Sequence, residues 1–432
     1  MADAAAECNG PDAPRKPLQL TRGALGWFQM QQLSPAETSL LAPIDSAAML
    51  ARVKAWCAIN TGSRNLAGLS QLAGLLADEL AALPGTVQRV AAAPVTALSA
   101  AGVEVDQPHG DHLVLRVRPD APRRVLLTGH MDTVFPADDP FQTLTWRDAD
   151  TLNGPGVADM KGGIAVIVEA LLAFERSPDA ARLGYDVLIN SDEEVGSPSS
   201  AALIADLARG KLAALTYEPS ALPDGTLAGA RGGSGNYSLV VHGRAAHAGR
   251  NPQDGRNAGV AAAALALALK ALETDGLAIN PARIDGGSAN NVVPDLAVLR
   301  FNIRPRTAAL ADAFAGGLAS LLAAVEREHD GRIHRHGGLS RPPKPMDAKA
   351  RRLFDLVGEC GAALGQTIRW QPSGGVCDGN NIAACGVPVV DTMGVRGGAI
   401  HSPDEYLIVP SLAERAALSA LVLHRLALGE RL

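Results

Sequence analysis

The sequence predicts an α/β fold in which an open mixed sheet carries helices on both faces and is interrupted by a ferredoxin-like α+β unit. Three observations support this prediction. Acidic residues and histidines directly follow several apolar runs, as at the carboxyl edge of an open α/β sheet. Residues 232 to 342, here called the insert, show a strand and helix order of their own. The 432 residues exceed one typical core, so we expect two domains.

The first apolar run, Val125 to Leu127, suits a buried parallel strand that ends at Gly129. His130 and Asp132 follow at its carboxyl end. Because side chains two apart on an extended segment share a face, Asp132 can hold the second nitrogen of His130 and make the imidazole a better metal ligand. A hydrogen-bonded loop histidine is the alternative.

Asp159 comes next, between a Gly/Pro turn and an apolar run with helical spacing. It is a candidate metal ligand, although the N-cap of that helix is the alternative role. Glu193 and Glu194 end the predicted strand YDVLIN. Neighbouring carboxylates repel unless cations or protons intervene, and their different directions allow different roles; a solvated acidic turn is the alternative. Two further runs end at Glu218 and, through a glycine-rich loop, at His401.

The insert is predicted to have the β-α-β-β-α-β order of a ferredoxin-like unit. Its expected elements are strands at 237–241, 278–284 and 296–304, helices at 257–273 and 307–328, and a last short strand. The turn-rich ARGGSGN and the proline-rich RPPKP at its two ends are candidate hinges. The stretch GVAAAALALALKAL is too short and too rich in small residues for a membrane span, so we expect a buried or dimer-contacting helix.

These observations divide the chain into four segments. They are an extension at 1–44, a first part of the larger domain at 45–231, the insert at 232–342 and a second part of the larger domain at 343–432. Residues 1–17 are expected to be mobile. Trp27, Phe28 and Met30 indicate that the rest of the extension docks on another surface.

Composition and charge argue against several classes of function. A net charge of -6 gives no reason to expect nucleic acid or an anionic membrane, and no stretch reaches transmembrane length without charges or helix breakers. Small-molecule or peptide ligands fit better. The five cysteines are scattered and without CxxC spacing, and the amino terminus lacks the apolar core of a secretory signal. We therefore expect a cytoplasmic protein.

Seven motifs together resemble the M20 family of metallopeptidases and deacylases, most nearly its glutamate carboxypeptidase branch, over roughly residues 45 to 430. They are GHMDTV, GPGVADMKGG, SDEEVGS, YEPS, RAAHAG, NNVVP and IHSPDEY. The resemblance implies a zinc-exopeptidase-like sheet and two divalent metal ions per subunit, zinc first, with cobalt or manganese as alternatives. It implies that Asp159 bridges the ions. His130 and Glu218 would complete one site, and Glu194 and His401 the other.

The resemblance also implies roles beyond the metals. Glu193 is similar to the family's general base, and Asp132 supports the centre beside it. His247 matches a donor to the scissile carbonyl oxygen, from the insert of the same chain or of a partner subunit. Asn291 matches a substrate-contacting asparagine. The insert is implied to act as a lid and to form a homodimer.

Arg304 lies on the polar face of the strand LAVLRFNIR, whose apolar residues alternate with polar ones. A guanidinium there can grip a substrate carboxylate bidentately, or it can simply face solvent. The resemblance favours the carboxylate. Gly374 and Gly375, in SGGVCDGNN, would let the backbone approach a ligand closely; a plain loop is the alternative.

Cys377 departs from the family branch, which usually has Thr or Ser at this position. A hydroxyl contact to the substrate is therefore not carried over to this chain. His109 and His112, in HGDHLVL, are expected to be surface residues and not ligands.

The predicted activity is that of a di-zinc M20-type metallohydrolase, which cleaves the amide bond of N-acyl amino acids or of short peptides with a free carboxylate. Deacylation of an N-acyl diamine or amino sugar, which would not need Arg304, is one alternative. A non-catalytic, metal-stabilised binding protein is another, and the presence of Glu193 argues against it.

Overall fold

The computed structural model of the chain describes residues 33–432. The expectations for residues 1–17 and for Trp27, Phe28 and Met30 lie outside the described residues. Three helices open the described part: α1 (Pro35–Leu41), α2 (Ser46–Cys57) and α3 (Leu66–Leu80).

A six-stranded mixed sheet, in the order β1-β4-β8-β5-β9-β18, organises the larger domain and confirms the predicted open mixed sheet. Its strands are β1 (Thr86–Val90), β4 (His112–Val117), β5 (Arg124–His130), β8 (Gly184–Asn190), β9 (Ala213–Thr216) and β18 (Val389–Val390). The strands from β8 to β18 run parallel, whereas β4 and β1 are antiparallel to their neighbours. Strands β8 and β9 are buried along their whole length, as expected for parallel strands covered by helices.

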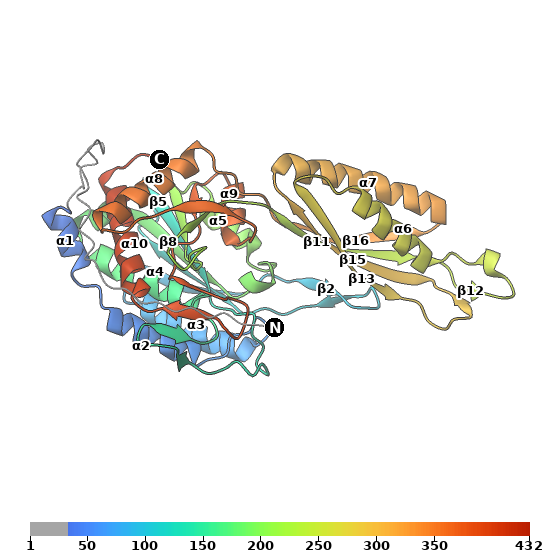
Figure 1. Cartoon of the computed structure of the whole chain (residues 1–432), viewed down its shortest axis with the longest axis horizontal. Coiled ribbons are helices and arrows are strands. Elements are labelled where there is room, and N and C mark those ends of the chain that lie inside the picture. Colours follow the sequence, from blue (N-terminus) through green and yellow to red (C-terminus); the bar gives the residue numbers. More distant parts are fainter. Residues whose placement is uncertain (1–32) are drawn as a thin grey trace, which may run out of the picture.

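Helices cover both faces of this sheet (Figure 1). Because neighbouring residues of β5 point to opposite faces, Leu127 packs in one core and Leu126 in another. The first core also contains residues of α4 (Lys161–Glu175), α8 (Ala348–Ala363) and α10 (Ser411–Leu428). The second contains residues of α5 (Ala201–Ala208) and α9 (Asp378–Ala384).

Two small sheets hold the loops above the carboxyl edge. The first joins β10 (Leu227–Arg231) to β17 (Trp370–Ser373). The second contains β19 (Gly397–Gly398), β20 (Tyr406–Ile408), β7 (Thr151–Asn153) and β6 (Thr145–Trp146). Since β7 precedes Asp159 and β19 precedes His401, the second sheet brings two predicted ligands towards each other.

The insert forms a separate four-stranded antiparallel sheet, in the order β13-β15-β11-β16. Its elements confirm the predicted ferredoxin-like order: β11 (Ser234–His242), α6 (Ala258–Ala271), β13 (Leu277–Gly286), β15 (Leu296–Pro305), α7 (Ala308–His329) and β16 (Arg332–Arg341). The last strand differs from the short strand expected: it is 10 residues long, because it pairs along the whole of β11.

Helices α6 and α7 pack on one face of the insert's sheet (Figure 1). The opposite side of α6 stays apolar and open, with Val260 55% and Leu267 76% exposed. Among the described residues, α7 is the one helix whose length and composition would permit a membrane span, with a mean hydropathy of 1.8. Its residues Phe314 and Leu318 nevertheless pack on the insert's sheet, as those of a core helix do.

The far end of the insert is closed by a short antiparallel pair, β12 (Ala246–His247) and β14 (Val292–Val293). Figure 1 shows β12 at the end of the insert farthest from the six-stranded sheet. We call this pair and its loops the tip.

The chain crosses between the two domains twice, and the two crossings are paired with each other. Arg231 and Lys344 exchange backbone hydrogen bonds, each 2.9 Å long, in an antiparallel bridge. The two predicted hinge segments therefore lie side by side.

A hairpin, here called the arm, extends from the larger domain to the insert (Figure 1). Its strands are β2 (Thr96–Leu98) and β3 (Glu104–Asp106). The Arg300 guanidinium donates to the carbonyl of Leu98 at 3.1 Å and of Ser99 at 2.7 Å. A Cβ on Gly102 would lie 2.8 Å from Cγ1 of Val240, so the glycine permits close contact with the face of the sheet opposite α6 and α7.

His109 and His112 are buried, so their prediction as surface residues was wrong. His112 begins β4, an interior strand of the six-stranded sheet, and its ring lies 3.4 Å from Ser191 Oγ and 3.3 Å from Ser199 Oγ. A polar residue at the start of a strand is expected to be exposed only if that strand lies at the edge of a sheet.

Candidate metal centre

The parallel strands bring the predicted ligands to one edge of the sheet. His130 is the last residue of β5, and Glu218 follows the end of β9. Glu193 and Glu194 follow β8 in a short 3-10 helix, η2 (Glu193–Val195). Asp159 precedes α4, whose N-cap is Met160, so the alternative of Asp159 as the N-cap was wrong.

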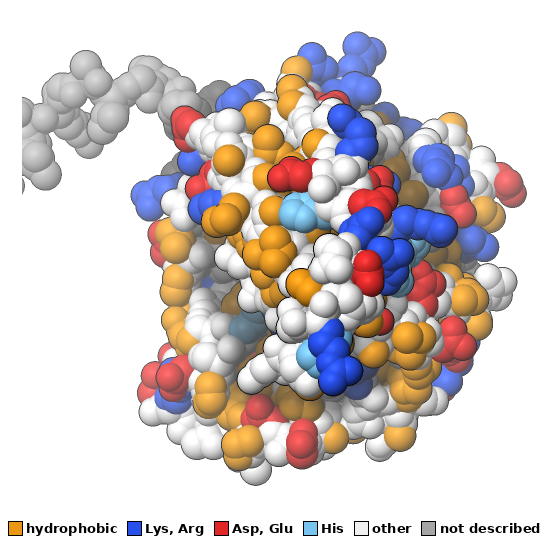
Figure 2. Space-filling model, turned by 90° about the vertical axis from the view of Figure 1, so that its right-hand side faces the viewer, with side chains coloured by type: hydrophobic (Ala, Val, Ile, Leu, Met, Phe, Trp, Pro, Cys, Tyr) orange, Lys and Arg blue, Asp and Glu red, His pale blue; other side chains and the backbone are white. Residues whose placement is uncertain are grey.

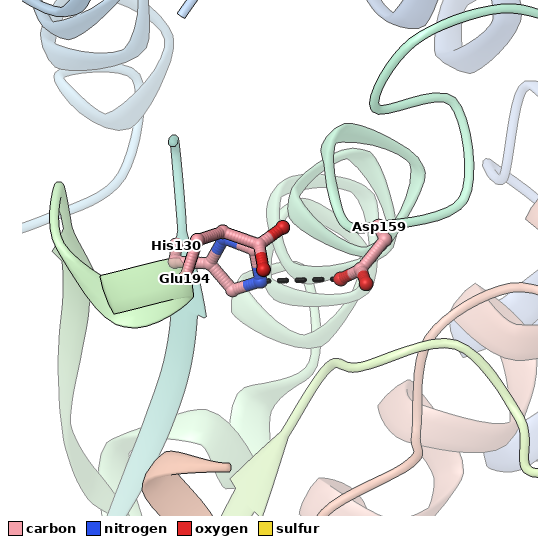
Figure 3. Close-up of side chains that lie close together, drawn as sticks. All are labelled: His130, Asp159 and Glu194. Carbon is pink, nitrogen blue, oxygen red and sulfur yellow. Dashed lines mark hydrogen bonds and ion pairs between the residues drawn. The ribbon is translucent and has the colours of Figure 1, made fainter. Parts of the chain in front are cut away.

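Asp159 lies between the two predicted histidine ligands and presents one oxygen to each. His130 Nε2 is 3.2 Å from Asp159 Oδ1 and 3.7 Å from Glu218 Oε2. His401 Nε2 is 3.3 Å from Asp159 Oδ2 and 3.2 Å from Glu194 Oε2. Figure 3 shows His130 and Asp159 facing each other, with the Glu194 carboxylate beside them. The predicted ligands thus form two groups that share Asp159.

This donor set fits two divalent cations. Imidazole and carboxylate donors suit zinc, and a shared carboxylate is typical of paired catalytic ions. Donor atoms of His130, Asp159 and Glu194 lie within 4.8 Å of one another, as do those of His130, Glu193 and Glu218. The second group would make Glu193 a ligand. Arg341 already holds one oxygen of Glu193, at 2.8 Å, so Glu193 is not among the predicted ligands.

Asp132 supports both His130 and the loop after β8. The Nδ1 atom of His130 lies 3.0 Å from the backbone oxygen of Asp132 and 3.4 Å from its carboxylate. Both groups only accept, so Nδ1 carries the proton and Nε2 keeps its lone pair for a metal. The Asp132 carboxylate also accepts from Ser63 Oγ at 2.7 Å and from the backbone N–H groups of Glu193 and Glu194, at 3.1 and 3.2 Å.

Glu405 holds the loop that presents Asp159, a role that was not predicted from the sequence. Its carboxylate accepts from the backbone N–H groups of Gly156 at 3.1 Å, Ala158 at 2.9 Å and Asp159 at 3.0 Å. The motif IHSPDEY contained this residue, but nothing local points to partners at least 246 positions away.

Asp192 organises the loop that carries Glu193 and Glu194. Its buried carboxylate accepts from the backbone N–H groups of Ser199 and Ser200, at 2.7 and 3.2 Å, and from both hydroxyls, at 2.7 and 2.6 Å. The serines of the motif SDEEVGSPSS thus fix the turn that positions the two glutamates.

Burial of several acids in one place changes their ionisation. Burial raises the pKa of Glu194 and of Glu218 to about 8, with the nearby charge of Asp159 adding to the effect. Hydrogen bonds to Asp159 and Glu194 raise the pKa of His401 to about 11. Without cations the centre therefore holds protons at neutral pH, and cations would displace them.

We expect the metal-free protein to lose stability as the pH rises from about 5 to about 9. The folded-state pKa of about 8 for Glu194 and Glu218 lies above their ordinary value of 4.5, so the folded state binds more protons than the unfolded state between these values. His401, raised from 6.5 to about 11, acts in the same direction at higher pH. Thermal unfolding of chelated and zinc-loaded protein across this range measures the effect. A chelated protein whose Tm climbs with pH would contradict it.

A cavity of about 590 Å³ lies beside the centre. Asp159, Glu193, Glu194, Glu218 and His401 line one side, and Gly374, Gly375, Cys377 and Arg231 line another. The predicted glycine loop thus faces the same space as the ligands, and none of the lining residues belongs to the insert.

Arg304 does not line this cavity. It is exposed at the end of β15 and lines a neighbouring hollow of about 1010 Å³, whose wall shares Arg231, Ser373 and Gly374 with the cavity. Its Nε atom donates to Asn302 Oδ1 at 3.0 Å. A bound molecule could extend from the cavity past the glycine loop to this arginine.

His247 and Asn291 lie together at the tip, away from the centre of the same chain. His247 pairs with Val292 across the short sheet, and the N–H of Ala248 donates to the backbone oxygen of Asn291 at 2.9 Å. Figure 2 faces this end of the molecule, where histidine side chains and Lys or Arg side chains are on the surface. His247 is among the exposed residues. The cavity of one chain does not contain either residue.

The sequence profile of the peptidase family M20/M25/M40 matches residues 126–425. The chain is 29% identical over 387 residues to carboxypeptidase G2 of Pseudomonas sp. (strain RS-16), covering 86% of this chain and 88% of that protein. It is 32% identical over 331 residues to a succinyl-diaminopimelate desuccinylase of Xanthomonas oryzae pv. oryzae, covering 71% of this chain and 84% of that protein.

Solved structures share the fold. A tripeptidase from Staphylococcus aureus matches with a TM-score of 0.67 at 22% identity, covering 89% of this chain and 99% of the other. A dinuclear metal-binding M20 peptidase from Bacillus subtilis matches with a TM-score of 0.61 at 14% identity, covering 89% and 99%.

Proposed function

Because this chain belongs to the M20/M25/M40 peptidase family, we propose that it is a dinuclear metallohydrolase that cleaves the amide bond of N-acyl amino acids or short peptides with a free carboxylate. The observation that carries the proposal is the position of Asp159, which presents one oxygen to His130 and the other to His401. Zinc suits these donors, and cobalt or manganese are alternatives. The likeness to carboxypeptidase G2 supports a substrate with a carboxylate.

The residues that line the cavity have different roles in the proposed reaction. A pair of divalent ions polarises a carbonyl group and lowers the pKa of water. Glu193 accepts the proton of the attacking water and passes it to the leaving nitrogen. In the metal-free protein burial raises the pKa of Glu193 to about 8, and bound cations would lower it, so that the carboxylate is ionised and can accept a proton near neutral pH. The Asp132 carboxylate accepts from the backbone N–H of Glu193, which fixes the backbone from which the Glu193 side chain extends.

Arg304 is the arginine we assign to the substrate carboxylate. Arg231, the other arginine near the glycine loop, already donates to both oxygens of Asp391, at 2.8 and 3.2 Å, and to the Gly375 carbonyl at 2.9 Å. These N–H groups of Arg231 are thus already used in hydrogen bonds within the protein. Arg304 is exposed, so its guanidinium is accessible to a bidentate partner.

Deacylation of an N-acyl diamine or diamino acid is the second candidate. The 32% identity to the desuccinylase favours it. A substrate of this kind releases a product that carries two amino groups. The same centre serves both reactions, so only the substrates tell them apart.

A substrate panel tests the proposed function. The protein is supplied with zinc, cobalt or manganese and assayed with N-acyl amino acids, dipeptides, N-acyl diamines and N-acyl amino sugars. We expect two ions per subunit by elemental analysis and release of a free amino acid. Protein that binds no divalent ion and hydrolyses none of these amides would overturn the proposal.

Arg304→Ala should raise KM for N-acyl amino acids by about 10- to 100-fold, because a charge-assisted hydrogen bond to a carboxylate is worth about 1.5–3 kcal/mol. The KM for the corresponding amides, which lack the carboxylate, should change little. Arg306→Ala is the matched control, since Arg306 lines the same hollow and is paired with Asp275 at 3.3 Å. Equal effects on acids and amides would assign Arg304 to the fold.

We also propose a cytoplasmic homodimer that assembles through the insert. The cysteines of the described part, Cys57, Cys360, Cys377 and Cys385, are free thiols, which suits a reducing compartment. The apolar outer side of α6 offers a surface for a two-fold partner. A partner would also supply His247 and Asn291, which do not line the cavity of their own chain.

A further inference from the structure

Arg341 is a buried arginine that belongs to one domain by its backbone and to the other by its side chain. It is the last residue of β16 and pairs with Ser234 in the insert's sheet. Its guanidinium lies in the larger domain beneath η2, and only 2% of the residue is exposed. A buried charge of this kind is costly unless its partners are well placed.

One end of the guanidinium holds Glu193. Nη2 donates to Glu193 Oε1 at 2.8 Å, to the Glu193 carbonyl at 3.3 Å and to Ser197 Oγ at 2.9 Å. The carboxylate and the backbone of Glu193 are thus held by the same nitrogen. This leaves Oε2 as the oxygen that Arg341 does not engage.

The other end anchors the guanidinium to the fold. Nη1 donates to the Asp378 carboxylate and to Asn381 Oδ1, the latter at 2.9 Å. Asp378 is fixed in turn, because Asn190 Nδ2 donates to it at 2.8 Å. The end of the Arg341 guanidinium opposite Glu193 is therefore tied to the larger domain.

We propose that Arg341 is a positioning residue that holds Oε1 of Glu193 and thereby directs Oε2 towards the reacting water. The inference rests on the proposed function, in which Glu193 is the base. A misplacement of about 1 Å in a catalytic group can cost about 100-fold in rate, so a fixed carboxylate matters. Arg341 does not bind substrate in this arrangement, because Nη1 and Nη2 already have protein partners and the residue does not line the cavity.

The position of Arg341 has a further consequence for the insert. The residue lies at the crossing between the domains, directly before the prolines of RPPKP. Arg341 therefore both holds Glu193 and connects the insert to the larger domain. A change in conformation at this crossing would alter the position of Glu193 without any contact between the insert and the cavity.

Replacement of Arg341 by Met and by Lys tests the proposal. Arg341→Met removes the donors and keeps most of the volume, so we expect kcat to fall by about 10- to 100-fold. KM should stay within about threefold and metal content should not change. Arg341→Lys, which keeps a cationic donor, should recover part of kcat. A raised KM with normal kcat would instead indicate substrate binding, and lost metal would indicate a structural role; either result overturns the proposal.

A double variant tests whether Arg341 acts through Glu193. If it does, Arg341→Met should cause no further loss of kcat when Glu193 is already replaced by Gln, since the two effects are not independent. An additional loss equal to that in the wild type would overturn the proposal. If Arg341→Met does not fold, the same cycle is run with Arg341→Lys.

A crystal structure of the metal-loaded Arg341→Met variant separates this inference from the proposed function. We expect the Glu193 carboxylate to move by about 1 Å or to become disordered, while Asp159 and Glu194 stay in place. An unmoved Glu193 overturns the positioning role even if the enzyme is active. Wild-type protein that hydrolyses no amide overturns the proposed function, and the crystal structure then decides the positioning role alone.

Discussion

Glu193→Gln should lower kcat by about 10²- to 10⁴-fold while two metal ions stay bound, because the change removes a proton acceptor and no ligand. Glutamine has the shape of glutamate, and its Oε1 can still accept from Arg341, which donates to that atom at 2.8 Å. The loss therefore reports proton transfer and not a collapsed loop. Steady-state kinetics and elemental analysis on the same preparation measure the two quantities.

Glu194→Gln is the matched control, on the neighbouring residue of the same short helix. Glu194 lies 3.2 Å from His401, and in the described part of the chain no hydrogen bond or ion pair joins it to Arg341, so we expect this variant to lose affinity for one of the two ions. Excess zinc should then restore part of its activity, and should not restore that of Glu193→Gln. Two variants with the same metal content and the same response to zinc would show that the division of roles is wrong.

His247→Ala should lower kcat by about 10²- to 10³-fold, the usual loss when a donor to a developing oxyanion is removed. The hydrogen bonds of the ring favour this role. Nδ1 accepts from the backbone N–H groups of Gly249 at 3.1 Å and Arg250 at 3.2 Å, so the proton of the neutral ring is on Nε2, which is free to donate. Metal content should stay at the wild-type value, because His247 is far from the centre of its own chain.

Mixed dimers test which subunit uses His247. A heterodimer of His247→Ala and Glu193→Gln subunits has one site with both residues intact if His247 acts across the dimer, and should show about half of the wild-type activity. The same heterodimer has no intact site if the insert delivers His247 to its own chain. Recovery of activity supports sharing, and its absence in confirmed heterodimers rules sharing out.

The positions of the predicted strand-end ligands could be inferred from the sequence for a physical reason. Parallel strands buried on both faces appear as continuous apolar runs, and their carboxyl ends meet at one edge of the sheet. The apolar runs that precede His130 and Glu218 are therefore enough to place these two residues together. The insert was predictable for the same kind of reason, since the alternation in β15 and the helical spacing of α6 are local patterns.

The supports of the centre were not accessible in this way. Arg341 and Glu193 are separated by 148 positions, and no period or motif links them. Glu405 lies in a recognisable motif, but its function appears only when its backbone partners are seen. The burial of His112 depends on the strand that forms outside β4, which is long-range information. Patterns reveal which element a residue belongs to, whereas a buried hydrogen bond depends on how distant elements meet.

The arm limits how the insert can move. The two crossings, paired by the bridge between Arg231 and Lys344, form a narrow two-stranded connection. Such a connection can twist or bend. The arm contacts the insert away from these crossings, where the Arg300 guanidinium donates to the backbone oxygen of Ser99 at 2.7 Å. Because this third attachment lies away from the axis of the two crossings, it opposes rotation of the insert about that axis. Any swing of the insert must therefore either bend the arm at its base or break this contact.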